Sequence, residues 1–489
     1  MTALAAIPAA ADTLRDALVA AYKTNPALAA DRAGVRALDE NVPIARSGGL
    51  PSVRATGNYT ENVLSSGDSL FAPAREAQAG TQLVVPVYTG GRVTGSVRAA
   101  ETRVDAGRAQ LRGSESDLFV GVVGAYMDVI RDEAIVALNQ ENVKVLNTNL
   151  EATRDRFQVG DLTRTDVAQS EARLSIARAT LDQSRSQLIA SRENYVRLVG
   201  NPPGTLETPP ALPNLPAASD DAVDLALKNN PALIGARRAA DATRFDVDVA
   251  KSARLPQISG VAGGSYYNYL GSYGAGTGVR PDQSGTAGTV GVQLTLPLFQ
   301  AGLPAAQIRQ AQERRVQAID QATDVERGVI AQTRSAYAMW KSALQVITSS
   351  EAAVSANKLS LEGVRAENSV GNRTILDILN AEQELLNSQV TLVSARRDAY
   401  VAGFALLAAM GLAEARDLGL DGGVLYDPTI NFNRVRNRIG DWSTGPVPQA
   451  GGTSTVGTAP QDATVTRPLD PELNQPVDTT TPNPAGVGK

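Results

Sequence analysis

The sequence predicts an α+β protein built from two tandem copies of one unit, each with a pair of strands and a very long helical hairpin. Three observations lead to this prediction. Short motifs recur at a fixed offset along the chain, two long windows lack proline, and the segments before these windows alternate apolar and polar residues. A repeat at a constant offset means that the two halves fold alike.

Matched motifs define the repeat. They lie 205 residues apart in the first part of each copy and, after a six-residue insertion, 211 residues apart. The matches are "TNPAL" from Thr24 with "NNPAL" from Asn229, Leu50-Pro51 with Leu255-Pro256, Ala125-Tyr126 with Ala336-Tyr337, and Gly200 with Gly411. We therefore predict a first repeat over residues 12–200, a proline-rich linker over 201–219 and a second repeat over 220–412, each repeat opening with a helix.

The apolar start of the chain, residues 1–11, ends in three alanines before Asp12. Small residues at this place fit the cleavage site of a secretory signal, although the usual basic beginning is missing. We interpret this segment as a residual signal peptide, and an ordinary alanine-rich helix start is the alternative. Export of a chain without cysteine suits a protein of the bacterial envelope.

Residues 87–201 and 305–427 contain no proline and leave room for one long helical hairpin in each repeat. An interior proline costs a helix about 3 kcal/mol, so such windows are typical of uninterrupted helices. Apolar residues recur every seven positions on both sides of Gly160 and of Gly371, which is the pattern of coiled-coil packing. We expect these two glycines to form the hairpin tips in a left-handed conformation.

Each repeat carries two candidate strands before its hairpin, at about residues 50–64, 79–89, 255–270 and 287–299. In the last of these, Val290, Val292 and Leu294 alternate with Gly291 and Gln293, which gives one apolar and one polar face. Tyrosines near the loop ends suit an interfacial aromatic belt or ordinary strand propensity: Tyr59, Tyr266, Tyr267 and Tyr269.

Four strands cannot close a barrel. Open edges in lipid leave backbone groups unpaired, at several kcal/mol each. Either the strands form a soluble sheet, or several chains share one barrel, with eight strands from two chains or twelve from three.

After the second repeat, residues 413–445 keep apolar and arginine content and are expected to pack on the body. Residues 446–489 are rich in proline, threonine, glycine and aspartate, a composition that predicts a disordered tail.

Composition excludes several functions. The chain of 489 residues has no cysteine and no histidine, so it has no thiolate or histidine metal ligands and no nucleophile activated by histidine. Its formal charge of −5 is spread along the chain, which argues against a nucleic-acid partner. No apolar run is long enough for a transmembrane helix. We expect neither an enzyme nor a cofactor or metal site.

Both hairpin turns carry the same helix-start signal. Thr163 and Asp166 follow Gly160, and Thr374 and Asp377 follow Gly371, each pair with the spacing of a capping box. An aspartate in the first helical turn also lies favourably in the helix dipole. Capping is the economical explanation of the aspartate that both repeats share.

Two copies of helix, strand pair, "P-[LV]-[FY]-x-x-G" and heptad hairpin resemble the TolC family of outer-membrane efflux and type I secretion channels. The resemblance covers about residues 12–425, and its most specific pieces are "LTLPLFQAG", "NNPAL" and "VGNRTILDILNAEQELL". It implies a homotrimer in which a 12-stranded β-barrel in outer-membrane lipid continues as a periplasmic helical barrel. It also implies a passive exit duct that docks onto an inner-membrane ABC or other transporter with its periplasmic adaptor.

The resemblance further implies a gate at the periplasmic tip that opens by an iris-like shift of the coiled coils. Arg373 and Asp377 match an arginine and the first of two aspartates that line the aperture in such proteins, and Asn380 stands where the second aspartate is expected. Asn368 replaces an aromatic residue before the turn. A competing hypothesis is a periplasmic coiled-coil adaptor or structural protein whose strands stay soluble.

Overall fold

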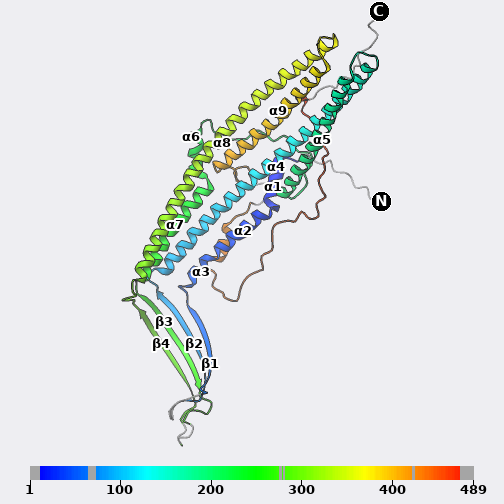
Figure 1. The fold of residues 1–489 in the computed structure, drawn as a ribbon. Coiled ribbons are helices and arrows are strands. Elements are labelled where there is room, and N and C mark those ends of the chain that lie inside the picture. The colour runs from blue at the N-terminus through cyan, green and yellow to red at the C-terminus, as the bar shows by residue number, and fades with distance from the viewer. Residues whose placement is uncertain (1–11, 64–72, 275–277, 279–280, 421–424, 474–489) are drawn as a thin grey trace, which may run out of the picture.

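The protein is a long rod with a sheet at one end and two helical tips at the other (Figure 1). The structure, a computed structural model, describes residues 12–63, 73–274, 278, 281–420 and 425–473. The predicted signal peptide, residues 1–11, lies outside these described residues, as do residues 474–489.

Ten helices, one short 3₁₀ turn and one four-stranded sheet make up the described part of the chain. The helices are α1 (Leu14–Thr24), α2 (Pro26–Asp39), α3 (Asn41–Ser47), α4 (Arg92–Gln158), α5 (Arg164–Val199), α6 (Ser219–Asn229), α7 (Pro231–Ser252), α8 (Leu303–Ser369), α9 (Ile375–Ala409) and α10 (Thr429–Val435), and the 3₁₀ turn is Pro471–Leu473. The strands are β1 (Ser52–Glu61), β2 (Arg75–Tyr88), β3 (Gln257–Asn268) and β4 (Ser284–Thr295).

The observed elements differ from the sequence-based bounds in two places. The single helix expected before each strand pair is divided, into α1, α2 and α3 in the first repeat and α6 and α7 in the second. Proline explains the first division in each repeat, because Pro26 and Pro231 each begin a new helix. Strands β2 and β4 begin a few residues earlier than expected, and β4 ends at Thr295, before Pro297.

The "NPAL" motif joins the short helices to the long hairpins in both repeats. Asn25 caps α2 by accepting hydrogen bonds from two backbone N–H groups, and its amide donates to the Leu198 carbonyl at 3.2 Å. Asn230 does the same for α7 and donates to the Ala409 carbonyl at 2.9 Å. One asparagine in each repeat thus bonds to backbone N–H groups at the start of one helix and to a backbone carbonyl at the end of another, groups that have no partner within their own helix.

The two long hairpins pack side by side. Hairpin 1 (α4 and α5) and hairpin 2 (α8 and α9) meet along α4 and α9, and α7 lies between α4 and α8 near the sheet. Helices α4 and α8 each have 67 residues, so each is about 100 Å long at 1.5 Å per residue. The main core lies where α1 meets both hairpins and contains Phe119, Tyr126, Leu188, Tyr195 and Phe404.

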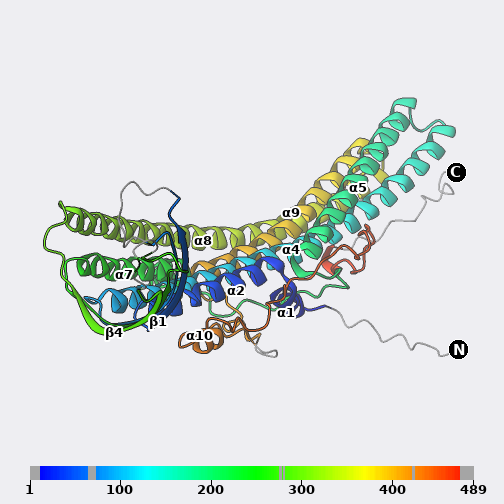
Figure 2. The ribbon, with the colours of Figure 1, turned by 90° about the horizontal axis from the view of Figure 1, so that it is seen from below.

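The four strands form one antiparallel sheet in the order β1-β2-β3-β4 and curve together at the end of the rod (Figure 2). The central pair, β2 and β3, comes from different repeats. Within the described residues the outer edges of β1 and β4 have no partner strand.

The proline-rich tail expected to be disordered is instead placed against the helices over residues 446–473. Thr453 donates its N–H to the Thr24 carbonyl at 3.1 Å, and Leu473 is buried. The expectation rested on composition, whereas the bonds that hold this segment come from residues that are distant in the sequence. Only the turn Pro471–Leu473 has regular structure.

Tyr126→Phe should destabilise the fold. The single proton of the buried Tyr126 hydroxyl is shared between the carbonyls of Asp12 at 2.9 Å and Glu207 at 2.7 Å, which fixes both the start of the first repeat and the linker. Its loss leaves these carbonyls short of a donor, and we expect the free energy of unfolding to fall by about 1–3 kcal/mol. Thermal unfolding in detergent measures this, with the exposed Tyr59→Phe as the control. Equal midpoints for the two variants would contradict it.

Candidate functional site at the helical tips and the open sheet

Glycine permits the reversal at each hairpin tip. Gly160 has a φ of 88° and Gly371 a φ of 80°, a left-handed conformation that other residues rarely adopt. The N–H groups of Gly371 and Asn372 donate to the carbonyls of Asn368 and Glu367, both at 3.0 Å. The Gly160 turn has the same pattern of bonds. Each long helix therefore ends in a Schellman motif.

Both returning helices begin with a capping box. The Thr374 N–H donates to the Asp377 carboxylate at 2.9 Å, and the Asp377 N–H donates to the Thr374 hydroxyl at 3.4 Å. Thr163 and Asp166 make the same pair of bonds at 2.8 and 3.3 Å. Hydrogen bonds from the threonine lower the pKa of each aspartate. Both carboxylates are therefore charged at neutral pH.

The tip of hairpin 2 differs from that of hairpin 1 by an arginine. Arg373 Nε donates to Glu367 at 2.7 Å, and the Asn368 amide donates to the Arg373 carbonyl at 2.7 Å. Asn368 thus closes the turn from within the same hairpin. The charge of Arg373 adds to the lowering of the Asp377 pKa. Arg373 is exposed and Asp377 is half-buried, and both belong to the turn between α8 and α9 at the end of the rod.

Asn380 bonds to the other hairpin. Its carbonyl oxygen accepts a hydrogen bond of 2.7 Å from Arg173 of α5. The three residues predicted to line the aperture therefore lie in two different environments within one chain. Arg373 and Asp377 lie at the turn, and Asn380 ties hairpin 2 to hairpin 1 just behind it.

Glu382, which the sequence analysis did not single out, connects three helices close to the tip. Its buried carboxylate accepts hydrogen bonds of 3.0 Å from Asn149 of α4 and 3.1 Å from Arg365 of α8. Burial raises the pKa of Glu382 above the ordinary 4.5, against the lowering effect of these two donors. The sequence does indicate that Glu382 is unusual, because it places a charged residue in an apolar seam between Ile378 and Leu385.

At the opposite end, the sheet has one apolar and one polar face. Register places Val53, Leu83, Ala262 and Val290 side by side in one row across the four strands. The next row, on the other face, is Arg54, Gln82, Gly263 and Thr289. The apolar row is open to the surroundings, with Val53 75% and Val290 90% exposed. An exposed apolar face of this kind is typical of a surface that contacts another protein or a membrane.

The tyrosines divide between the two faces. Tyr59 and Tyr266 lie on the apolar face near the loop end of the sheet. Tyr267 lies on the polar face, and Tyr269 packs its ring against Tyr267 and Tyr273 at centroid distances of 5.1 and 4.9 Å. The first two therefore have the position of an interfacial belt, and the others do not.

None of the helices in the described part of the chain combines the length and apolar character needed to cross a bilayer. Among the same described residues, no group of acidic side chains has the arrangement of a metal site.

An open sheet with one apolar face, carried on helical hairpins of about 100 Å, defines the class of outer-membrane channel protomers. The outer membrane efflux protein family profile matches residues 17–201 and 222–412 of this chain. The chain belongs to the outer membrane efflux protein family, and it is an outer-membrane protein that extends into the periplasm.

Named relatives agree with this assignment. The chain is 35% identical to the outer membrane efflux protein BepC of Brucella suis, over 89% of this chain and 93% of that protein. It is 26% identical to the outer membrane protein TolC of Escherichia coli, over 83% and 84%. The crystal structure of the outer membrane protein VceC from Vibrio cholerae shares the fold, with a TM-score of 0.69, 21% identity, and coverage of 81% of this chain and 96% of that one.

Glu382→Gln should change how stability depends on pH. Because the folded-state pKa of Glu382 is raised, the folded protein holds this proton above pH 4.5, where the unfolded chain has released it. The contribution to stability is therefore full at acid pH and falls as pH rises through the folded-state pKa. We expect the free energy of unfolding of the wild type, minus that of E382Q, to decrease over this range.

Thermal unfolding in detergent at a series of pH values measures this difference. The exposed neighbour Glu384→Gln is the control for loss of one charge from α9. A difference between wild type and E382Q that stays constant from acid to neutral pH would show that burial of this carboxylate does not matter.

Proposed function

We propose that this protein is the exit duct of a tripartite efflux or type I secretion system, a homotrimer whose pore is passive and gated at the periplasmic tip. The open sheet carries this proposal. Its outer edges, on β1 and β4, would leave backbone groups unpaired in lipid at several kcal/mol each. Three copies joined edge to edge supply a closed barrel of twelve strands.

The two faces of the sheet fit this arrangement. The row containing Val53 and Val290 would face lipid, and the row containing Arg54 and Gln82 would line the lumen. In a membrane barrel, side chains alternate in this way between lipid and water. The competing hypothesis of a soluble adaptor leaves the apolar row without a covering, and family membership favours the channel.

The helices would continue the duct through the periplasm. Helix α8 exposes apolar side chains along its length, Val316, Ile319, Met339 and Leu344 among them, and neighbouring protomers would cover them. An inner-membrane ABC or other transporter, with its periplasmic adaptor, would supply the energy. The relatives include AprF of Pseudomonas aeruginosa, an alkaline protease secretion protein, so transport of proteins as well as small compounds fits the family.

At the closed tip, three copies would bring three Asp377 carboxylates around the pore axis. A ring of like charges at a constriction attracts cations and sets ion access. Arg373, held by Glu367, lies beside each carboxylate and partly offsets its charge. Asn380 adds no charge to this ring, so the cation affinity would come from Asp377 alone.

Charges on the two faces of β4 should have opposite consequences. An arginine on the lipid face near the bilayer centre costs about 2–4 kcal/mol, and one in the lumen does not. We expect Val290→Arg to reduce the yield of heat-labile trimer in the outer-membrane fraction, and the adjacent Thr289→Arg to assemble as the wild type does. Gel electrophoresis with and without heating measures both. Equal yields of the two variants, or a wild type outside the outer membrane, would refute the barrel.

The two capping aspartates provide a matched test of the gate. Asp377→Ala and Asp166→Ala each remove one capping box and one first-turn charge, so each should destabilise its helix by about 0.3–1 kcal/mol. Only D377A should also relieve block of the channel by divalent cations in planar bilayers. If both variants keep the block of the wild type, Asp377 is a cap and no more.

A further inference from the structure

The tail segment, residues 462–473, bridges the two hairpins. It runs past α5 and α4 of hairpin 1 and then reaches α9 of hairpin 2. Its last described residue lies level with Leu138 of α4, twenty residues before the end of that helix and so about 30 Å from the tip. We call these residues the strap.

The strap is fixed to hairpin 1 by hydrogen bonds to the two members of a buried ion pair, Arg192 and Glu133. The side chain of Arg192 on α5 is 6% exposed, and it donates to Glu133 of α4 at 2.5 Å. The same guanidinium donates to the carbonyls of Asp462 at 2.9 Å and Thr464 at 2.6 Å. Thr466 of the strap donates to Glu133 at 3.0 Å. Arg192 thus gives two hydrogen bonds to the strap backbone and a third, of 3.1 Å, to the Asp462 side chain.

The strap is fixed to hairpin 2 by a buried leucine and by ion pairs. Leu473, 2% exposed, packs in a cluster with Leu386 and Val393 of α9 and Leu138 of α4. The amide of Gln389 donates to the Leu473 carbonyl at 3.0 Å. Arg396 donates to Asp470 at 3.3 Å and to Glu472 at 3.0 Å.

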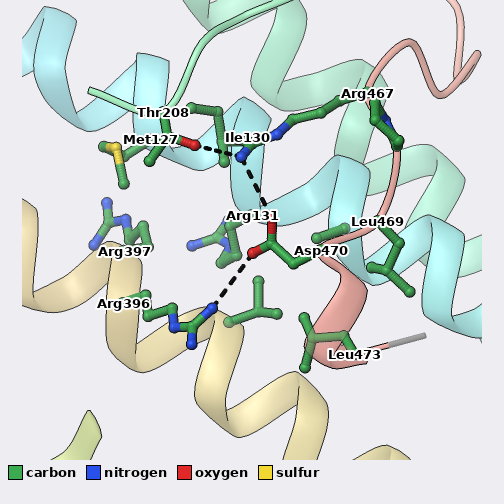
Figure 3. A pocket seen from close by; sticks show the side chains of 13 residues that line it. Met127, Ile130, Arg131, Thr208, Arg396, Arg397, Arg467, Leu469, Asp470 and Leu473 are labelled. Carbon is green, nitrogen blue, oxygen red and sulfur yellow. Dashed lines mark hydrogen bonds and ion pairs between the residues drawn. The ribbon is translucent and has the colours of Figure 1, made fainter. Parts of the chain in front are cut away.

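Between these two attachments the helices leave a space that the strap covers. A cavity of about 300 Å³ lies between α4 and α9, with Met127 and Ile130 on one side and Val393 on the other. Pro468 and Leu469 of the strap also line it, and Figure 3 shows Leu469 there. In the same view Arg467 bonds to Thr208 of the linker and pairs with Asp470. At this level the strap adds a second connection between the two hairpins, beside the direct ion pair of 2.8 Å between Arg397 of α9 and Asp128 of α4.

We propose that the strap restrains opening of the pore by holding hairpin 2 against hairpin 1. This inference rests on the proposed function, in which the tip opens when the hairpins shift apart. Such a shift at the level of the cavity has to break the attachment to Arg192 or the attachment around Leu473. Release of the strap therefore favours the open state.

Single-channel recording of the trimer in planar bilayers tests the strap. Leu473→Ser removes the buried attachment, and a chain that stops after Gln461 removes the strap altogether. Each should raise the ratio of open to closed time about tenfold, the shift expected when a buried leucine or a charge-assisted hydrogen bond is lost. Val456→Ser, at an exposed position upstream of the strap, is the matched control and should leave the ratio unchanged.

A reversible link gives the opposite change. The chain has no cysteine, so Leu473→Cys combined with Leu386→Cys adds one unique pair within the same cluster. Oxidation should lower the open fraction below that of the wild type, and reduction should restore it.

Channels of L473S and of the linked pair that open as often as the wild type would overturn the strap and leave the duct intact. A wild-type trimer that forms no channel would overturn the proposed function and, with it, the role of the strap.

Discussion

The need to pair every backbone N–H and C=O of the sheet governs the rest of the molecule. In the part of the chain that the structure describes, four antiparallel strands leave the outer edges of β1 and β4 open, and lipid offers these groups no hydrogen bonds. Only more strands can satisfy them, and in the proposed trimer the sheet of one chain is a third of a barrel. The positions of the long helices follow from the position of the sheet, because β2 and β4 lead into α4 and α8 after short turns. The apolar side chains that α8 exposes have the same explanation, since in the proposed trimer neighbouring protomers cover them.

Features set by a few neighbouring residues could be predicted from the sequence. Left-handed Gly160 and Gly371, the two capping boxes and the alternation around Val290 all depend on residues within one turn of each other. Contacts between the hairpins could not be predicted. Arg173 and Asn380 are 207 residues apart, and Asn149 and Glu382 are 233 apart. The heptads show which face of each helix is apolar, and they do not show how one hairpin is rotated against the other. The gate role of Arg373 and Asp377 depends on a second and third chain and stays a prediction.

Polar residues in the seam of α9 fix which segments pack against this helix, and the apolar heptad alone does not. Glu382, Gln389 and Arg396 recur every seven residues beside the apolar positions. A polar group in such a seam costs stability unless it finds a partner, and it fixes register when it does. Here the partners differ along the helix. Glu382 bonds to α4 and α8 near the tip, whereas Gln389 and Arg396 bond to the strap.

This seam also explains why a segment of low-complexity composition has a fixed place. Prolines deny the strap a helix or strand of any length, so its carbonyls have no regular partners of their own. Arg192, with five N–H donors and almost no exposure to water, needs acceptors. The carbonyls of Asp462 and Thr464 accept from two of these donors, and the Gln389 amide donates to the carbonyl of Leu473. Without the strap, buried donors on both hairpins would have to take up water. The hairpins would then separate more readily, because donors that already bond to water lose no hydrogen bonds when the hairpins move apart.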